Sequence, residues 1–293
     1  MNIADFGMDT ITLAGSLEAK LEAMRDAGFS QVMLSARDVA GYPGGVDAAA
    51  EVVAASGLRV TGFQVLRDFE GLGGPLHDYK IGVAKAMLEM CRAVGAPLLL
   101  VCSSTSKHAS DDPDALARDL AKLATLAVPM GLRIAYEALS WGRVVNEYTA
   151  AWDIVDRAGC ANLGLGLDTF HLYASGTPLD PLDEVDPSRI FLVQLADFMW
   201  NVLPSQEDRI ATARHFRVFP GEGVHGPDIA DIVRRLDAAG YRGDYSFEVF
   251  NDDYQQMPPD AVARRARASA AQLSQQVTRR SLPLSPQTAT AMR

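Results

Sequence analysis

Apolar strand-like runs and helix-like segments alternate along this chain at intervals of roughly 25 to 40 residues, which is the spacing of successive βα units. The first helix-like segment is typical, since Ser16 stands where an N-cap is favoured and Gly28 where a helix ends. Eight strand-like runs are found in this way, at 6–13, 30–35, 59–66, 97–103, 133–139, 163–168, 189–195 and 245–250.

Most of these runs are almost continuously apolar, as in LGLGLD at 163–168 and RIFLVQL at 189–195. That pattern is typical of parallel strands that are buried on both faces. Eight strands with about eight helices predict one (β/α)8 domain, a TIM barrel, over residues 1–275. A doubly wound open sheet is the structural alternative. The segment 276–293 is rich in Ser, Thr and Pro without apolar periodicity, and we expect a disordered tail there.

The composition disfavours nucleic acids and membranes as partners of this protein. The chain is 48% apolar and carries a formal charge of −10, so a nucleic-acid partner is not expected, because nucleic-acid binding needs a basic face. No apolar run is long enough to span a bilayer, so no membrane partner is expected either. The N-terminus has no secretory pattern, and Cys91, Cys102 and Cys160 lack any paired spacing. We therefore expect a cytoplasmic protein without disulfides.

An oxygen donor stands near the end of each of the last four strand-like runs. These donors are Glu137, Asp168, Gln194 and Glu248. A buried carboxylate or amide is costly unless a partner meets it, and a barrel would bring all four to its open end. Each one alone could be a helix cap or the partner of a buried arginine. Four in register predict instead one divalent-metal site, with a hard-donor set suited to Mg²⁺ or Mn²⁺, and hence a metal-dependent enzyme.

Further polar and aromatic residues lie close to these strand ends. His171 follows Asp168 by three positions, in DTFH, where a neutral imidazole either removes a proton from a substrate or merely orients Asp168. Trp141, in YEALSWGR, either lines the substrate pocket or packs over the barrel rim. His215, beside Arg214, either contacts the substrate or anchors the connection on which it lies.

Two arginines suit a bidentate grip on a substrate carboxylate. Arg67 directly follows the third strand-like run, and Arg217 lies in the connection from Asp197 to Gly226. A connection of that length is typical of an active-site lid. The alternative for Arg67 is a surface ion pair with Asp68 or Glu70, the usual fate of an arginine in a loop.

Several motifs taken together resemble the bacterial 3-dehydroshikimate dehydratases of quinate and shikimate catabolism, which belong to the xylose-isomerase-like TIM-barrel superfamily of sugar phosphate isomerases and epimerases. The resemblance extends from the N-terminus to about Asn251. Its combination of motifs is specific, although single ones also occur in sugar isomerases. The motifs are RDFEG at 67–71, YEALSWGRVVNEY, LGLDTFH, FLVQLAD, RHFRVFPGEG and SFEVFND.

The resemblance implies that the four strand-end donors bind one divalent metal ion, which would be Mg²⁺, Mn²⁺ or Co²⁺. It implies that His171 is an acid/base and that Arg67 and Arg217 hold the substrate, so that Arg217 counts among the catalytic candidates. The implied reaction converts 3-dehydroshikimate to protocatechuate. A base removes the proton beside a metal-polarised ketone, an enolate forms, and hydroxide leaves with acid assistance.

The chain departs from the family pattern around the substrate and not around the metal. Ala213 stands where the family has Ser, Phe216 stands where it has a second His, and the connection 197–214 is longer. The second strand ends in QVMLSARDV, without the acidic residue that the relatives carry. These departures leave the exact substrate open. The native metal is open as well, and so is the oligomeric state, including whether the chain forms a homo-oligomer.

The alternative function is that of a sugar or cyclitol isomerase or epimerase, which would use the same metal site. A nuclease on such a barrel would need a histidine-rich zinc cluster and a basic groove, and both the five scattered histidines and the charge of −10 disfavour it. The intact donor set likewise disfavours a barrel that only binds a ligand.

Overall fold

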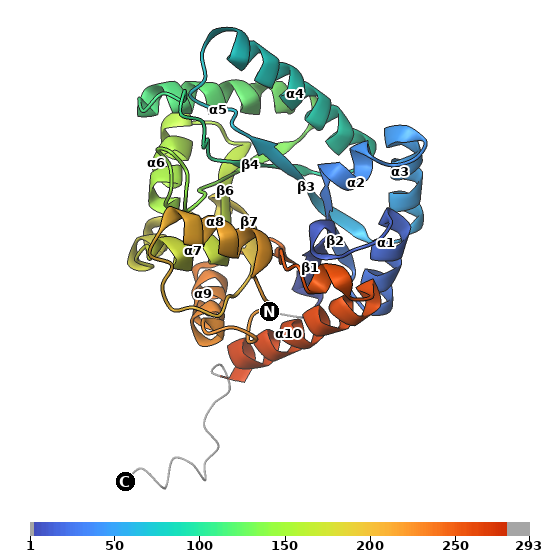
Figure 1. The fold of residues 1–293 in the computed structure, drawn as a ribbon. Coiled ribbons are helices and arrows are strands. Elements are labelled where there is room, and N and C mark those ends of the chain that lie inside the picture. The colour runs from blue at the N-terminus through green and yellow to red at the C-terminus, as the bar shows by residue number, and fades with distance from the viewer. Residues whose placement is uncertain (1–2, 280–293) are drawn as a thin grey trace, which may run out of the picture.

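The computed structural model describes residues 3–279, in which parallel strands close into a barrel (Figure 1). Each strand pairs with the next along the chain, and the last pairs with the first. The prediction of a TIM barrel is confirmed, and the open doubly wound sheet is excluded. The strands are β1 (Phe6–Asp9), β2 (Gln31–Ser35), β3 (Arg59–Arg67), β4 (Leu98–Cys102), β5 (Arg133–Glu137), β6 (Leu163–Asp168), β7 (Ile190–Leu195) and β8 (Tyr245–Phe247).

Helices form the ring around this barrel, as Figure 1 shows. None of the described helices is both long and apolar enough to cross a membrane. The helices are α1 (Leu17–Asp26), α2 (Ala36–Ala40), α3 (Gly45–Ala55), α4 (Gly74–Ala93), α5 (Pro113–Ala127), α6 (Tyr148–Ala158), α7 (Thr169–Ser175), α8 (Gln206–His215), α9 (Gly226–Ala239) and α10 (Pro259–Arg279).

The helix boundaries follow from local capping chemistry. The Ser16 hydroxyl accepts a hydrogen bond from the Ala19 amide and opens α1, and Gly28, with φ of +86°, lies just beyond its end. At the start of α5 the Asp112 carboxylate accepts from the Asp114 amide. These side chains satisfy amide groups that the first turn of a helix leaves without partners.

Two sets of apolar side chains hold the layers together. The larger set fills the space between the strands and the outer helices. A separate small cluster from β2, β4, β5 and β7 comprises Met33, Leu98, Leu100, Ala135, Phe191 and Leu192, which fits the layered filling of a TIM-barrel interior. The polar strand ends stand above this apolar filling.

The ends of the chain differ in part from expectation. The first strand ends at Asp9, not at residue 13, because the Asp9 carboxylate accepts from the Ile11 amide and opens a 3₁₀ turn at Thr10–Thr12. Helix α10 continues to Arg279, so that residues 276–279 of the expected tail are helical. The rest of that tail, 280–293, lies outside the described residues.

Candidate metal centre and substrate cleft

The strand register places the four expected metal ligands at one end of the barrel. Glu137 is the last residue of β5, and Asp168 at the end of β6 lies opposite Gln194 of β7. Glu248 directly follows the last residue of β8. All four side chains are buried. The shared end of neighbouring parallel strands is the reason that residues far apart in sequence meet here.

Glu137, Asp168 and His171 form a group of potential metal-ligating atoms, each within 4.8 Å of the others. Glu248 joins them through Arg217, whose Nη1 donates to Asp168 Oδ2 at 2.6 Å and to Glu248 Oε2 at 3.0 Å. Carboxylates from β5, β6 and β8 therefore surround one small region of the barrel mouth.

Three buried polar atoms of the four expected ligands have no hydrogen-bond partner among the described residues. They are Glu137 Oε1 and both amide atoms of Gln194. A buried polar atom without a partner costs about 1–3 kcal/mol, so such atoms call for a ligand. Carboxylate and amide oxygens are suited to a hard divalent cation, and the residues present therefore fit such an ion.

The carboxyl groups crowd one another without enough positive charge to compensate. Burial raises the pKa of Glu137 well above its ordinary value, and the neighbouring Asp168 and Glu248 add to that rise. Burial also raises the pKa of Asp168 to about 6, although the Arg217 guanidinium acts in the opposite direction. A bound dication would supply the missing charge.

His171 lies beside this group as a neutral ring. Burial lowers its pKa well below the ordinary value, and the charges of Arg217 and Arg67 lower it further. Its Nδ1 accepts from the Ser140 amide at 3.1 Å and also lies 3.2 Å from the Ser140 hydroxyl. Its Nε2 lies 3.8 Å from Asp168 Oδ2. With the ring hydrogen on Nε2, Nδ1 accepts from the Ser140 amide. With the hydrogen on Nδ1, the ring donates to the Ser140 hydroxyl and the amide loses this acceptor.

Arg217 is a buried part of this centre and not a loop residue that reaches in from a lid. Its side chain is 3% exposed, and its guanidinium lies 4.4 Å from the centre of the Phe170 ring. The Asn251 amide group donates to its backbone oxygen at 2.8 Å. Arg217 is thereby held against two of the expected metal ligands.

The connection from Asp197 to Gly226 is more ordered than a simple lid. The buried Asp197 carboxylate accepts from the backbone amides of Phe198, Gly221 and His225, which ties the FPGEG turn to the end of β7. Within the same connection, α8 is a helix that the sequence did not predict. It begins at a capping box in which the Ser205 and Asp208 side chains satisfy each other's amides.

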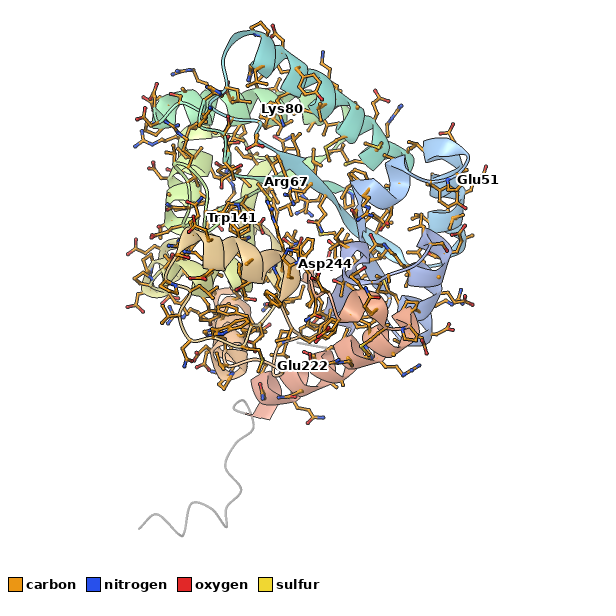
Figure 2. All side chains as sticks on the ribbon, viewed as in Figure 1. Glu51, Arg67, Lys80, Trp141, Glu222 and Asp244 are labelled. Carbon is orange, nitrogen blue, oxygen red and sulfur yellow. The ribbon has the colours of Figure 1, made fainter. Side chains whose placement is uncertain are left out.

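Arg67 and Trp141 line a cleft of about 50 Å³ together with Glu137, His171, Arg217 and Glu248. Figure 2 labels both residues within the ring of helices. The Trp141 ring meets the His171 ring edge-on, with 5.0 Å between their centres. Trp141 therefore lies against the catalytic candidate, and its role as a substrate contact stays a prediction.

The surface ion pair considered for Arg67 is not formed among the described residues, where both candidate carboxylates accept from other groups. Asp68 accepts from the amide of Thr105 at 2.8 Å and from its hydroxyl at 3.1 Å. Glu70 is buried and accepts from the Tyr136 hydroxyl at 2.9 Å. The Arg67 guanidinium is left exposed at the rim of the cleft, available to a substrate.

His215 is not brought to the site. Its ring is 48% exposed and pairs with Asp252 at 3.1 Å. The interpretation of this residue as an anchor of the connection fits the structure better than its role as a substrate contact. Of the two departures beside it, Ala213 lines the cleft, whereas Phe216 is 47% exposed and meets Trp200 edge-on.

The model of the xylose isomerase-like TIM barrel family matches residues 21–273 of this chain. The chain belongs to this family. A 3-dehydroshikimate dehydratase of Pseudomonas aeruginosa is 41% identical over 255 residues, which is 87% of this chain and 39% of that protein. An inosose isomerase of Halalkalibacterium halodurans is 27% identical over 190 residues, which is 62% of this chain and 64% of that protein.

Among solved structures, a xylose isomerase-like TIM barrel/4-hydroxyphenylpyruvate dioxygenase fusion protein superimposes with a TM-score of 0.88 at 33% identity. The match covers 97% of this chain and 45% of the fusion protein. The chain thus spans less than half the length of both the dehydratase and the fusion protein that it matches.

Two residues of this site were not anticipated from sequence. Cys102, which the sequence marked only as a cysteine without paired spacing, donates its thiol hydrogen to Glu137 Oε2 at 2.9 Å. It lies directly opposite Glu137 in the β4–β5 register, so its place at a strand end was the available signal. Ser140 carried no signal, because a loop residue's contact with His171 depends on how the loop folds.

Proposed function

We propose that this protein is a metal-dependent dehydratase, a carbon–oxygen lyase that converts 3-dehydroshikimate to protocatechuate by eliminating water. The observation that carries this proposal is the pair of unpartnered buried oxygens on Glu137 and Gln194, of which Gln194 lies opposite Asp168 in the β6–β7 register. The 41% identity to the Pseudomonas aeruginosa dehydratase supports the choice of reaction.

Glu137, Asp168, Gln194 and Glu248 would hold one Mg²⁺, Mn²⁺ or Co²⁺ ion. When bound, that ion would polarise a ketone oxygen and acidify the adjacent carbon. Three carboxylates would then face one dication and the Arg217 guanidinium, so that the formal charges of the centre cancel. Arg217 acts by removing the residual negative charge that would otherwise repel an acidic substrate.

His171 is the proposed proton-transfer residue. In the tautomer that donates from Nδ1 to the Ser140 hydroxyl, Nε2 is free to take the proton from the carbon beside the ketone. An enolate forms, and hydroxide leaves from the next carbon. The protonated ring then gives its Nε2 proton to the departing hydroxide, which is released as water. Tautomerisation of the remaining ring to an aromatic product makes the reaction effectively irreversible.

Arg67 is the proposed partner of the substrate carboxylate. It lines the same cleft as His171, and its guanidinium has no carboxylate partner among the residues that the structure describes. Trp141 lines the same cleft and meets the His171 ring edge-on, which fixes one wall beside the substrate. The substrate is thus a small anionic hydroxy-ketone acid. We place the protein in the cytoplasm, which its three free cysteines support.

The second candidate is a cyclitol isomerase, favoured by the similarity to the Halalkalibacterium halodurans inosose isomerase. It would use the same metal and proton-transfer chemistry without elimination, on a neutral substrate for which Arg67 has no use.

The test is to incubate the purified protein with 3-dehydroshikimate and Mg²⁺, Mn²⁺ or Co²⁺ and to follow protocatechuate by its absorbance. A parallel incubation with inosose, followed for isomer formation, is the comparison. Chelator-treated protein and a Glu137→Gln variant are the controls, and both should be inactive. Turnover of inosose without any protocatechuate would replace the dehydratase by the isomerase.

A further inference from the structure

Three arginines at the barrel mouth carry charge that no described residue neutralises. Arg37 follows β2 in sequence, Arg67 ends β3, and Arg214 lies near the end of α8. Their guanidinium groups have no hydrogen bond or ion pair within residues 3–279. Every other described arginine side chain has a hydrogen bond, an ion pair or an aromatic ring as its partner.

The carboxylate next in sequence to Arg37 is already occupied. Asp38 accepts two hydrogen bonds from the Lys20 ammonium group, at 2.8 and 3.0 Å, and the side chains of this pair are only 12% and 8% exposed. Arg37 is therefore an exposed, uncompensated cation, as Arg67 is beside Asp68. In a chain of net charge −10, an arginine left without a carboxylate near a cleft points to an anionic ligand.

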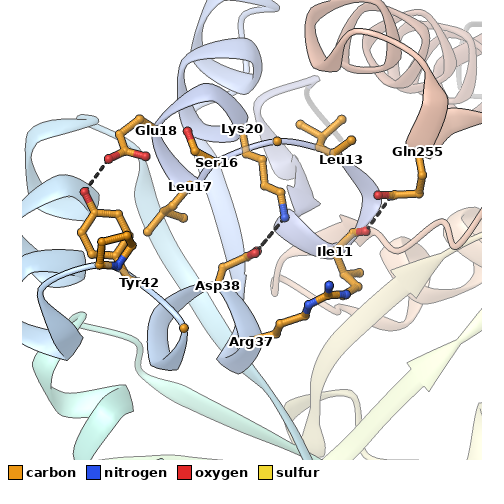
Figure 3. A pocket seen from close by; sticks show the side chains of 14 residues that line it. Ile11, Leu13, Ser16, Leu17, Glu18, Lys20, Arg37, Asp38, Tyr42 and Gln255 are labelled. Atoms are coloured by element: carbon orange, nitrogen blue, oxygen red, sulfur yellow. Dashed lines mark hydrogen bonds and ion pairs between the residues drawn. The ribbon is translucent and has the colours of Figure 1, made fainter.

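Arg37 and Arg67 line the same hollow. A cleft of about 260 Å³ is bounded by both arginines, by Ser35 and by Phe250. It adjoins the cleft at the metal centre, with which it shares Arg67 and Phe250. On its other side it shares Arg37 and Ile11 with a pocket of about 810 Å³, in which Figure 3 shows Arg37 extending toward Ile11 beyond the Lys20–Asp38 pair.

Ser35 adds a hydrogen-bond donor to this hollow. Its side-chain oxygen accepts from the Arg37 amide at 3.3 Å, and no described residue accepts its hydroxyl hydrogen. Two guanidinium groups and a hydroxyl form a set of donors without a competing carboxylate in the lining of the 260 Å³ cleft. Guanidinium groups bind carboxylate and phosphate oxygens in pairs.

We propose that Arg37 and Arg67 flank a second anion subsite, which receives a carboxylate or phosphate group of a ligand that also reaches the metal centre. This inference rests on the proposed function and refines its substrate class. Arg67 suffices for the single carboxylate of 3-dehydroshikimate, so Arg37 has an anionic partner only when the ligand carries a second anionic group. A ligand that fills both this subsite and the cleft at the metal centre is then a cyclic hydroxy-ketone acid with a second anionic group, which 3-dehydroshikimate lacks.

The test compares the affinities of three aromatic acids for the metal-loaded protein by calorimetry. Benzoate carries one anionic group, whereas isophthalate carries two carboxylates and 3-carboxyphenyl phosphate carries one carboxylate and one phosphate. We expect one of the two doubly anionic acids to bind at least about 10-fold more tightly than benzoate, and the tighter one identifies the group that the subsite takes. Arg37→Gln should abolish that gain and leave the affinity for benzoate unchanged.

The matched control is Arg118→Gln, because Arg118 is also exposed but lies on α5, outside the three pockets of the mouth. It should keep the gain. The subsite is ruled out if neither doubly anionic acid outperforms benzoate, or if Arg37→Gln retains the gain, while protocatechuate formation continues. If the proposed function is wrong but the subsite exists, the results differ: the gain in affinity and its dependence on Arg37 persist, but no protocatechuate forms.

Discussion

The two halves of the barrel mouth differ in the charge of their side chains. Strands β5 to β8 carry buried oxygen donors at their last residue or within one residue of it, and burial together with the neighbouring carboxylates raises the pKa of Glu137 and Asp168. Strands β2 and β3 lead instead to Arg37 and Arg67, both exposed and without a carboxylate partner among the described residues.

This difference in charge and burial suits the strand ends to metal binding and the rim to substrate recognition. A metal centre needs donors fixed to within a few tenths of an ångström, and the barrel register supplies that rigidity. Recognition of a substrate tolerates a more mobile side chain on the rim. Arg217 belongs to the acidic half, since it is buried against Asp168 and Glu248, although it comes from a connection and not from a strand.

The largest effect is expected in the acidic half, for Asp168→Asn. Asparagine can still accept the hydrogen bond that Asp168 Oδ1 takes from the Phe170 amide at 2.8 Å, so helix α7 keeps its cap. One of three carboxylate charges is lost, and metal affinity should fall by more than about 100-fold, beyond the loss typical of residues behind the ligands. Activity should disappear with it.

Metal titration by calorimetry measures this effect, with Asp252→Asn as the control, because Asp252 is a surface carboxylate that pairs with His215. Unchanged metal affinity in Asp168→Asn would remove Asp168 from the ligand set and weaken the contrast between the two halves.

The next effect separates chemistry from metal binding. His171→Asn should retain metal affinity and lose on the order of 10²- to 10⁴-fold in kcat, the usual scale for removal of a general base. Steady-state kinetics at saturating metal are the measurement, and His108→Asn, an exposed histidine, is the control. A near-normal kcat would assign proton transfer to another group of the acidic half.

In the cationic half, Arg67→Ala should raise KM for a carboxylated substrate about 30-fold, with a smaller effect on kcat. The loss corresponds to a charge-assisted pair of about 2 kcal/mol. Arg92→Ala, an exposed arginine on α4, serves as the control. If the protein turns over a neutral polyol better than any carboxylate and Arg67→Ala is indifferent to it, the cationic half has no role in recognition and the isomerase takes the place of the dehydratase.

The same contrast explains how much the sequence could predict. Glu137, Asp168, Gln194 and Glu248 were identifiable because hydrophobic runs define the strands and the barrel fixes where their ends meet. The directions of loop side chains could not be predicted, because Arg217 turns inward to Asp168 and Glu248, and His215 turns outward to Asp252, through contacts that exist only once the loops have folded. Helix α8 was missed because QEDRIATARH lacks an apolar stripe and depends on its capping box.

A smaller effect concerns Ser140, the loop residue that selects the tautomer of His171. Ser140→Ala removes the hydroxyl that can accept from Nδ1 but keeps the backbone amide that donates to it. The tautomer with a free Nε2 becomes less favourable by about one hydrogen bond, so kcat should fall about 10-fold at constant metal affinity.

The pH dependence of kcat distinguishes this role from a packing defect, since the shape of the profile should change in Ser140→Ala and not in Ser175→Ala. Ser175 is a serine of α7 whose hydroxyl donates to the backbone oxygen of His171. Equal profiles in the two variants would leave Ser140 with a structural role only.

The smallest expected effect is a shift of a few degrees in the metal-dependent Tm. In the metal-free protein, burial raises the pKa of Asp168 to about 6, above the value of about 4 expected in the unfolded chain. A carboxyl group of this kind stabilises the fold fully below pH 4 or so, and its contribution is lost as the pH rises through 6. The pKa of Glu137, which burial also raises, changes the stability in the same direction.

Metal binding needs these groups ionised, so the rise in Tm on addition of Mn²⁺ should be small at pH 5 and grow toward pH 7.5. Thermal denaturation with and without Mn²⁺ across this range is the measurement, and Asp168→Asn should flatten the dependence. A rise in Tm that is independent of pH would mean that the acidic half is not the metal site, and the opposition of the two halves would lose its physical basis.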